Sequence, residues 1–342
     1  MSLRSLALPI AFVLSWFIGS ACGKEPAKTP EKPAPAKPVT KGDKSSAKDK
    51  NADRFMRVRR NDKGTPLAME TVVSSYVSAN DSKPGVVVDL IGAVHVGEKQ
   101  YYEDLNKLFD GYEVVLYELV APQGTVVTKE ARTKGGNAHP VGLLQDGMKS
   151  MLGLEHQLDC IDYAKKNFVH ADMSPEEFNK SMTERGESFM QMFLKMMGQG
   201  MAQQQNGDGG GDAALLMALF SRDRNLKLKI AMAEQLGNAG GQLDILSGPE
   251  GSTIITERNR KCFEVLSKEL EAGKKKIGVF YGAGHFADME DRLVKEFGLK
   301  RSAEKWLVAW NLEKPAPRAE PKKGDLKKSE AKKEEPKVEE KK

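Results

Sequence analysis

The middle of the chain alternates between two patterns of apolar and polar positions. Short runs of β-branched and aromatic residues predict strands, and apolar residues spaced three or four positions apart predict helices. The predicted strands cover residues 55–60, 67–78, 86–91, 113–120, 167–171, 276–280 and 306–310. The predicted helices cover residues 98–109, 139–166, 253–270 and 287–297, and a further helix begins at Ser174. Strands that alternate with helices predict an α/β domain with a central, partly parallel sheet flanked by helices.

Residues 189–220 depart from this alternation. They are rich in Met and Gln and contain a glycine-rich stretch at 207–211. We expect a helical Met/Gln/Gly-rich insertion that packs on the domain, with the glycines as a flexible break. Met-rich helices beside a hinge also suit a lid, a membrane-touching surface or a partner groove, and the sequence leaves these alternatives open.

The first 22 residues predict export. Arg4 gives a positive start, residues 6–17 are mostly apolar, and small residues precede Cys22, which is the order of a secretory signal peptide. The apolar run is shorter than the roughly 20 residues that a membrane-spanning helix needs. The ending resembles the lipobox of bacterial lipoproteins, although Gly19 stands where a Leu-like residue is usual. The resemblance implies lipidation of Cys22 and a lipid anchor at the periplasmic face of a membrane or at the cell surface. The alternative is an ordinary signal peptide with an incidental cysteine.

Both flanks of the predicted domain have the composition of disordered chain. Residues 23–54 and 314–342 are rich in Lys, Pro, Ala and Glu and have almost no residues that can enter a core. They predict a linker and a tail around one α/β domain at 55–313. Much of the charge lies in these flanks, so the net charge of +5 says little about partners. The predicted domain has no basic stripe interleaved with aromatic residues, so we expect no nucleic-acid partner.

Two strand ends carry the same short pattern, Gly-x-x-His. His95 follows the strand at 86–91, and His285 follows the strand at 276–280. In an open α/β sheet, ligands bind beyond the carboxyl ends of the strands, and glycines there let the backbone turn tightly. A single such histidine is more often a capping or core residue. Two in the same context, among five histidines in the chain, predict one shared site.

Three further polar residues lie in predicted apolar surroundings. Glu118 lies within the predicted strand at 113–120, where a buried charge needs a partner such as a metal ion, a His or an Arg. The alternative is that Glu118 points outward on a half-exposed strand. Arg258 and Asn259 border the apolar stripe of the helix at 253–270. We expect them to bond either a carboxylate of the fold or one of a substrate.

These stretches together resemble the TraB/PrgY/GumN family, in the wider group of TIKI proteases, ChaN-like proteins and erythromycin-esterase-like proteins. The resemblance rests on residues 92–95, the strand with Glu118, the Glu-Arg-Asn sequence at 257–259 and residues 282–285. Gly153-Leu154-Glu155 is similar to the family's Gly-x-Glu on a helix. The chain lacks the His-Glu-x-x-His of well-known peptidases, and the insertion is not typical of the family.

The resemblance implies a metal-dependent, peptidase-like hydrolase. His95, Glu118 and His285 would hold a divalent ion such as Mn, Zn or Co, because two histidines and a glutamate are sound ligands. Glu155 would be a fourth ligand or general base, Arg258 would hold the substrate or the oxyanion, and Asn259 would contact the substrate. The alternative is a protein without catalysis that uses the same pocket for haem, another ligand or a peptide. The sequence does not identify the peptide or small-molecule substrate.

Overall fold

A computed structural model describes residues 52–122, 124–125, 151–188, 217–218, 220–247 and 251–314. Within these ranges, the side chains of 52–53 and 238–247 are not described. Cys22, most of the predicted linker, residues 189–216 of the predicted insertion and nearly all of the predicted tail lie outside them. No helix in these ranges is long and apolar enough to cross a membrane.

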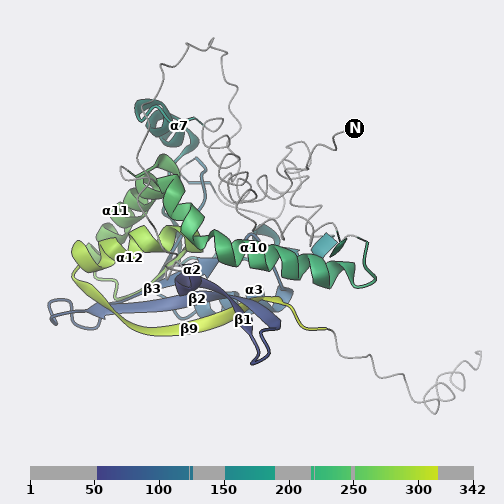
Figure 1. The fold of residues 1–342 in the computed structure, drawn as a ribbon. Coiled ribbons are helices and arrows are strands. Elements are labelled where there is room, and N and C mark those ends of the chain that lie inside the picture. The colour runs from purple at the N-terminus through teal and green to yellow at the C-terminus, as the bar shows by residue number, and fades with distance from the viewer. Residues whose placement is uncertain are drawn as a thin grey trace, which may run out of the picture. The chain divides into compact units, whose positions relative to one another are not determined.

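The described residues form nine strands and a set of helices (Figure 1). The strands are β1 (Met56–Arg60), β2 (Pro66–Ser78), β3 (Val87–Ala93), β4 (Val96–Gly97), β5 (Val114–Tyr117), β6 (Glu155–His156), β7 (Phe168–His170), β8 (Lys276–Gly282) and β9 (Leu299–Asn311). The α-helices are α2 (Ala52–Phe55), α3 (Lys99–Phe109), α6 (Gln157–Cys160), α7 (Pro175–Glu184), α10 (Arg224–Ser247), α11 (Arg258–Glu271) and α12 (Phe286–Lys295). A π-helical turn, η2 (Thr253–Glu257), leads into α11, and a 3-10 turn, η3 (Ala283–His285), leads into α12. This alternation confirms the predicted α/β class.

Seven strands form one mixed sheet in the order β1-β2-β3-β8-β5-β7, with β9 also paired to β2. The strands β3, β8, β5 and β7 are parallel neighbours, and β1, β2 and β9 pair antiparallel. Because β9 follows β2 over nearly its whole length, β1 and β3 share the other edge of β2. The strands β3 and β8 are buried along almost their whole length, which is typical of parallel strands covered on both faces.

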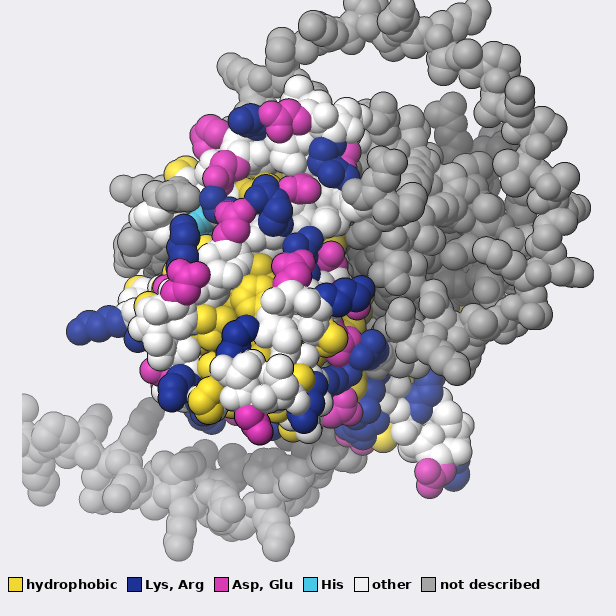
Figure 2. Space-filling view, turned by 90° about the vertical axis from the view of Figure 1, so that its left-hand side faces the viewer, with side chains coloured by type: hydrophobic (Ala, Val, Ile, Leu, Met, Phe, Trp, Pro, Cys, Tyr) yellow, Lys and Arg dark blue, Asp and Glu magenta, His cyan; other side chains and the backbone are white. Residues whose placement is uncertain are grey.

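Helices cover the sheet, and their apolar residues join its core. In Figure 1, α10, α11 and α12 lie on one side of β1, β2 and β9. The helix α3 contacts β9 and buries Tyr101, Tyr102, Leu105 and Phe109. Figure 2 shows the side of the molecule near α12, where Lys and Arg side chains are mixed with Asp and Glu around apolar patches.

The carboxyl ends of the four parallel strands lie at one edge of the sheet. Ala93 at the end of β3 is in register with Gly282 at the end of β8. Tyr117 at the end of β5 is in register with both Phe280 of β8 and His170 of β7. The residues that follow these four strands are therefore brought to the same edge.

Four predicted elements differ from the structure, one of them the strand predicted at 306–310, which begins at Leu299. The strand predicted at 113–120 ends at Tyr117, so Glu118 follows the strand. The helix predicted at 139–166 is interrupted in its described part: Gly153 has φ +65° and ends the preceding helical turn, Glu155–His156 pairs with β4, and helical structure returns only over α6. The helix predicted at 253–270 begins with the π-helical turn. By contrast, Ser174 caps α7 as predicted, in a capping box with Glu177.

A glycine in β8 provides a test of the sheet packing. A Cβ at Gly278 would lie 3.0 Å from Ile91 Cδ1 and 3.3 Å from Tyr112 Cδ2. We expect Gly278→Ala to lower the free energy of unfolding by about 1–3 kcal/mol because it overpacks the core. Ile91→Val removes the nearest atom and alone should cost about 0.5–1.5 kcal/mol.

The double variant should lose less than the sum of the two single losses, as measured by urea unfolding. Strictly additive losses would contradict this account of the packing between β3 and β8.

Candidate functional site

Each of the four parallel strands delivers a polar residue to the shared edge. His95 follows β3, His285 follows β8, Glu118 follows β5 and Asp172 follows β7. The first turn of α11 adds Arg258 and Asn259. These residues come from distant parts of the sequence, and the parallel register brings the four strand ends together.

Arg258 joins two of these carboxylates. Its Nε donates to Asp172 Oδ1 at 2.9 Å, and its Nη2 donates to Asp172 Oδ2 at 2.5 Å and to Glu118 Oε1 at 2.8 Å. The side chains of Arg258 and Asp172 are 2% and 0% exposed, and that of Glu118 is 13% exposed. With one guanidinium and two carboxylates, the group has a net charge of −1.

The pKa values of the group follow from these contacts. Burial alone would raise the pKa of Glu118, but Arg258 and the two histidines His285 and His95 outweigh burial and hold that pKa well below its usual range. Burial alone would lower the pKa of Arg258, but Asp172 and Glu118 outweigh it and raise that pKa. Glu118 is therefore a carboxylate at neutral pH, and the backbone N–H of Gly282 donates to its Oε2 at 2.7 Å.

Asn259 fixes the ring of His285. The Asn259 Nδ2 donates to the His285 carbonyl oxygen at 3.0 Å and to Asp288 Oδ2 at 2.8 Å. The Oδ1 of the same amide therefore faces His285 Nδ1, 2.6 Å away. An amide oxygen can only accept, so Nδ1 carries a proton and donates it.

The other ring nitrogen of His285 lies close to Glu118 and makes no hydrogen bond. His285 Nε2 is buried, has no hydrogen-bond partner and lies 3.6 Å from Glu118 Oε1. With Nδ1 protonated, neutral His285 presents a lone pair at Nε2, and protonation there gives a cation beside Glu118. That cation supplies the positive charge that the group of Arg258, Asp172 and Glu118 lacks.

Tyr281 and Cys262 form the buried wall behind these residues. Tyr281 packs its ring edge-to-face against His285 at 5.3 Å, and its hydroxyl donates to the Ala171 carbonyl oxygen. Burial raises the pKa of both Tyr281 and Cys262. Both groups are therefore neutral at physiological pH and add no charge beside His285.

The structure brings together part of the predicted set. His285, Glu118 and Arg258 are in direct contact or in ion-pair range, and His95 acts on Glu118 electrostatically. Glu155, expected on a helix, pairs in β6 opposite Gly97, two residues beyond His95. Asn259, expected to contact a substrate, has its amide engaged by His285 and Asp288.

Two carboxylates of the site were not among the predicted site residues. Asp172 comes directly after the predicted strand at 167–171, so its position at a strand end was the available signal. Asp288 lies in the first turn of α12 and bonds both Asn259 and Arg292. Its role depends on how α11 and α12 pack, and no local pattern reveals that.

The expected metal site is only partly formed. A histidine whose Nδ1 donates to an oxygen and whose Nε2 is bare is typical of metal ligation, and Glu118 offers carboxylate oxygens beside it. However, no group of three His, Cys, Asp or Glu side chains in the described ranges is arranged to hold a metal ion. His95, Glu118 and His285 as they stand do not make the three-ligand set, so we derive no step through a metal ion.

Comparison of the chain with models of known families, with curated proteins and with solved structures gave no match. The family resemblance therefore depends on the short motifs alone.

The low pKa of Glu118 predicts how acid affects stability. The pKa of Glu118 is lower in the folded protein than the value of about 4.3 in an unfolded chain, so its ionised form stabilises the fold. That contribution is complete above the unfolded pKa and is lost as the pH falls through the folded pKa. We expect Glu118→Gln to be less stable than the wild type at pH 7 by about 1–3 kcal/mol and to lose less stability on acidification.

Urea unfolding between pH 7 and pH 3 measures this difference. The matched control is Glu264→Gln, which removes a 47% exposed carboxylate paired with Arg260 on the surface and should follow the wild-type pH dependence. A Glu118→Gln curve that runs parallel to the wild type would contradict the assignment.

Proposed function

We propose that the protein is a hydrolase in which His285 and Glu118 form the acid–base centre. The observation that carries the proposal is His285 Nε2, a buried lone pair with a fixed tautomer that faces a carboxylate 3.6 Å away. Hydrolysis of a carbonyl compound needs a group that takes a proton from water and returns it to the leaving group. The family resemblance suggests a peptide as the substrate.

The proton steps follow from this geometry. His285 Nε2 takes a proton from a water molecule as the water oxygen bonds to the carbonyl carbon of the substrate. The imidazolium that forms is stabilised by Glu118. It then gives the same proton to the departing nitrogen or oxygen as the bond to the carbonyl carbon breaks, which returns His285 to its neutral form.

Glu118 and Arg258 have different parts in this proposal. Glu118 stays ionised because Arg258 bonds it, so it acts as a fixed negative charge and leaves the proton transfers to His285. Arg258 Nη1 has no hydrogen-bond partner, so its N–H groups remain to donate to the oxygen that gains charge during attack.

A second candidate function is a binding protein without catalysis. His285 and Arg258 are each only 2% exposed, and a buried ion group of this kind also suits a purely structural role. Hydrolysis assays on variants of His285 and Glu118 separate the two functions.

Removing either member of the pair should abolish hydrolysis. We expect His285→Gln and Glu118→Gln each to lower activity by about 10²–10⁴-fold, measured on a panel of peptide, ester and amide substrates. Glu264→Gln should keep wild-type activity. The metal content of each purified protein is measured in parallel, because the resemblance implies Mn, Zn or Co.

A double variant tests whether His95 belongs to the same centre. Groups that act as a unit have strongly non-additive effects, so His95→Gln combined with His285→Gln should lose little more activity than either alone. Wild-type protein without hydrolysis on the whole panel would favour the binding function. Additive stability losses with unchanged activity would instead show two independent structural histidines.

We also propose that the protein is exported and held at a membrane through Cys22, on the evidence of the first 22 residues. Cys22→Ser should move the protein from the membrane fraction to the soluble exported fraction, because lipidation needs the thiol. Fractionation and immunoblotting of the exported protein give the readout. A variant that stays with the membrane would contradict lipidation. A variant retained in the cytoplasm would contradict the expectation that Cys22 is needed for the anchor and not for export.

A further inference from the structure

Four backbone carbonyl oxygens around His95, those of Gly92, Val94, His95 and Val96, each accept a hydrogen bond from another part of the fold. The donors are, in that order, the Tyr101 hydroxyl at 2.5 Å, the Tyr102 hydroxyl at 2.8 Å, the Gln157 backbone N–H at 2.8 Å and the Trp310 Nε1 at 2.7 Å. We call these four donor residues the strand-exit clamp. They bond nearly every residue of the five-residue segment on which His95 lies.

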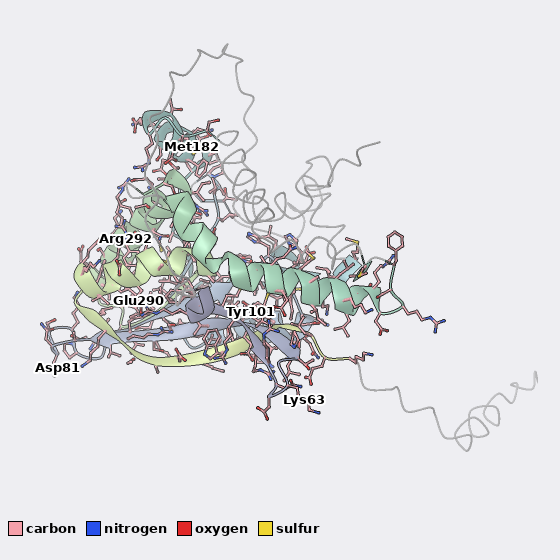
Figure 3. All side chains as sticks on the ribbon, in the orientation of Figure 1. Lys63, Asp81, Tyr101, Met182, Glu290 and Arg292 are labelled. Atoms are coloured by element: carbon pink, nitrogen blue, oxygen red, sulfur yellow. The ribbon has the colours of Figure 1, made fainter. Side chains whose placement is uncertain are left out.

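The donors of the strand-exit clamp come from three separate elements. Tyr101 and Tyr102 are on α3, Gln157 begins α6 and Trp310 is near the end of β9. The three aromatic residues are 0–2% exposed and Gln157 is 6% exposed. Figure 3 labels Tyr101, whose hydroxyl reaches Gly92 of β3. Three parts of the fold therefore meet on one short segment.

Two glycines let the clamp close. A Cβ at Gly92 would lie 3.0 Å from Thr71 Cβ, and a Cβ at Gly97 would lie 3.2 Å from Tyr101 Cδ1 and 3.3 Å from the Tyr102 hydroxyl. Larger residues would push α3 and β2 away from the segment. By contrast, a Cβ at Gly282, before His285, would meet only ordinary contacts.

His95 and His285 are thus held by different means. His285 has its ring fixed by Asn259, whereas His95 has its backbone fixed by the strand-exit clamp. A buried phenol or indole needs some acceptor in any fold. Here three such donors share one strand exit, and the partly buried imidazole at its centre acts on Glu118.

We propose that Tyr102 and Trp310 are positioning residues that fix where the His95 ring lies relative to Glu118. This inference rests on the proposed function, because the position of the His95 ring matters for catalysis only if Glu118 belongs to the acid–base centre. Loss of either donor frees one carbonyl beside His95 and lets the segment shift. The ring of His285, which is held through α11, should stay in place.

Histidine-selective NMR tests this directly, because the chain has five histidines. Uniformly ¹⁵N-labelled full-length protein is compared with Tyr102→Phe and Trp310→Phe through the long-range ¹H–¹⁵N correlations of the imidazole rings. His95→Gln and His285→Gln identify the two sets of signals. The matched control is Trp306→Phe, since the Trp306 Nε1 donates to Glu304 on the surface.

We expect the His95 signals to shift or split in Tyr102→Phe and Trp310→Phe, with the His285 signals unchanged. Trp306→Phe should leave both sets unchanged. Folded variants with wild-type His95 signals would overturn the proposal, as would equal shifts at His95 and His285. Tyr102→Phe keeps its ring and removes a single oxygen, so it provides the test if Trp310→Phe fails to fold.

The NMR result and the hydrolysis assay can fail independently. A His95 shift in protein that hydrolyses nothing would support the clamp and refute the acid–base centre. Hydrolysis together with unmoved His95 signals would support the acid–base centre and refute the positioning role of the clamp.

Discussion

The fold and its candidate site depend on the hydrogen-bonded ion pairs that the buried guanidinium of Arg258 makes with two carboxylates. It bonds Asp172 at the end of β7 and Glu118 at the end of β5, and Glu118 in turn accepts from Gly282 at the end of β8. One helix is thereby bonded to the ends of three strands. Removal of Arg258 would leave two buried carboxylates without their cation, at a cost of about 3–5 kcal/mol. The same contacts also set the charge that faces His285.

The position of Arg258 depends on an irregular turn. The π-helical turn η2 directly precedes Arg258, and π-helical geometry is frequent at functional sites. Residues in and after α7 hold this turn: Ser181 bonds the Thr253 hydroxyl at 2.8 Å, and Glu187 accepts from the Thr253 backbone N–H at 3.0 Å. Because Asp172 lies just before α7, the chain that supplies one partner of Arg258 also shapes the turn that presents it.

Two similar sequence motifs are stabilised by different physics at this edge. After β8, the chain enters a 3-10 turn and α12, and the ring of His285 is oriented by Asn259. After β3, the chain continues through β4, and hydrogen bonds to carbonyl oxygens hold the backbone of His95. The first arrangement fixes the tautomer of His285. This difference is why we assign the proton transfers to His285 and treat His95 as its electrostatic neighbour.

The sequence by itself determined the alternation of strands and helices, the capped start of α7, and the location of His95 and His285 at strand ends. These features depend on local propensity and periodicity, which neighbouring residues encode. Tertiary structure decided that Asp172 meets Arg258, that Asn259 is engaged by His285 and Asp288, and that Trp310 reaches the His95 segment. Those pairs join elements 26 to 214 residues apart. Their contacts follow from sheet order and helix packing, which no local pattern specifies.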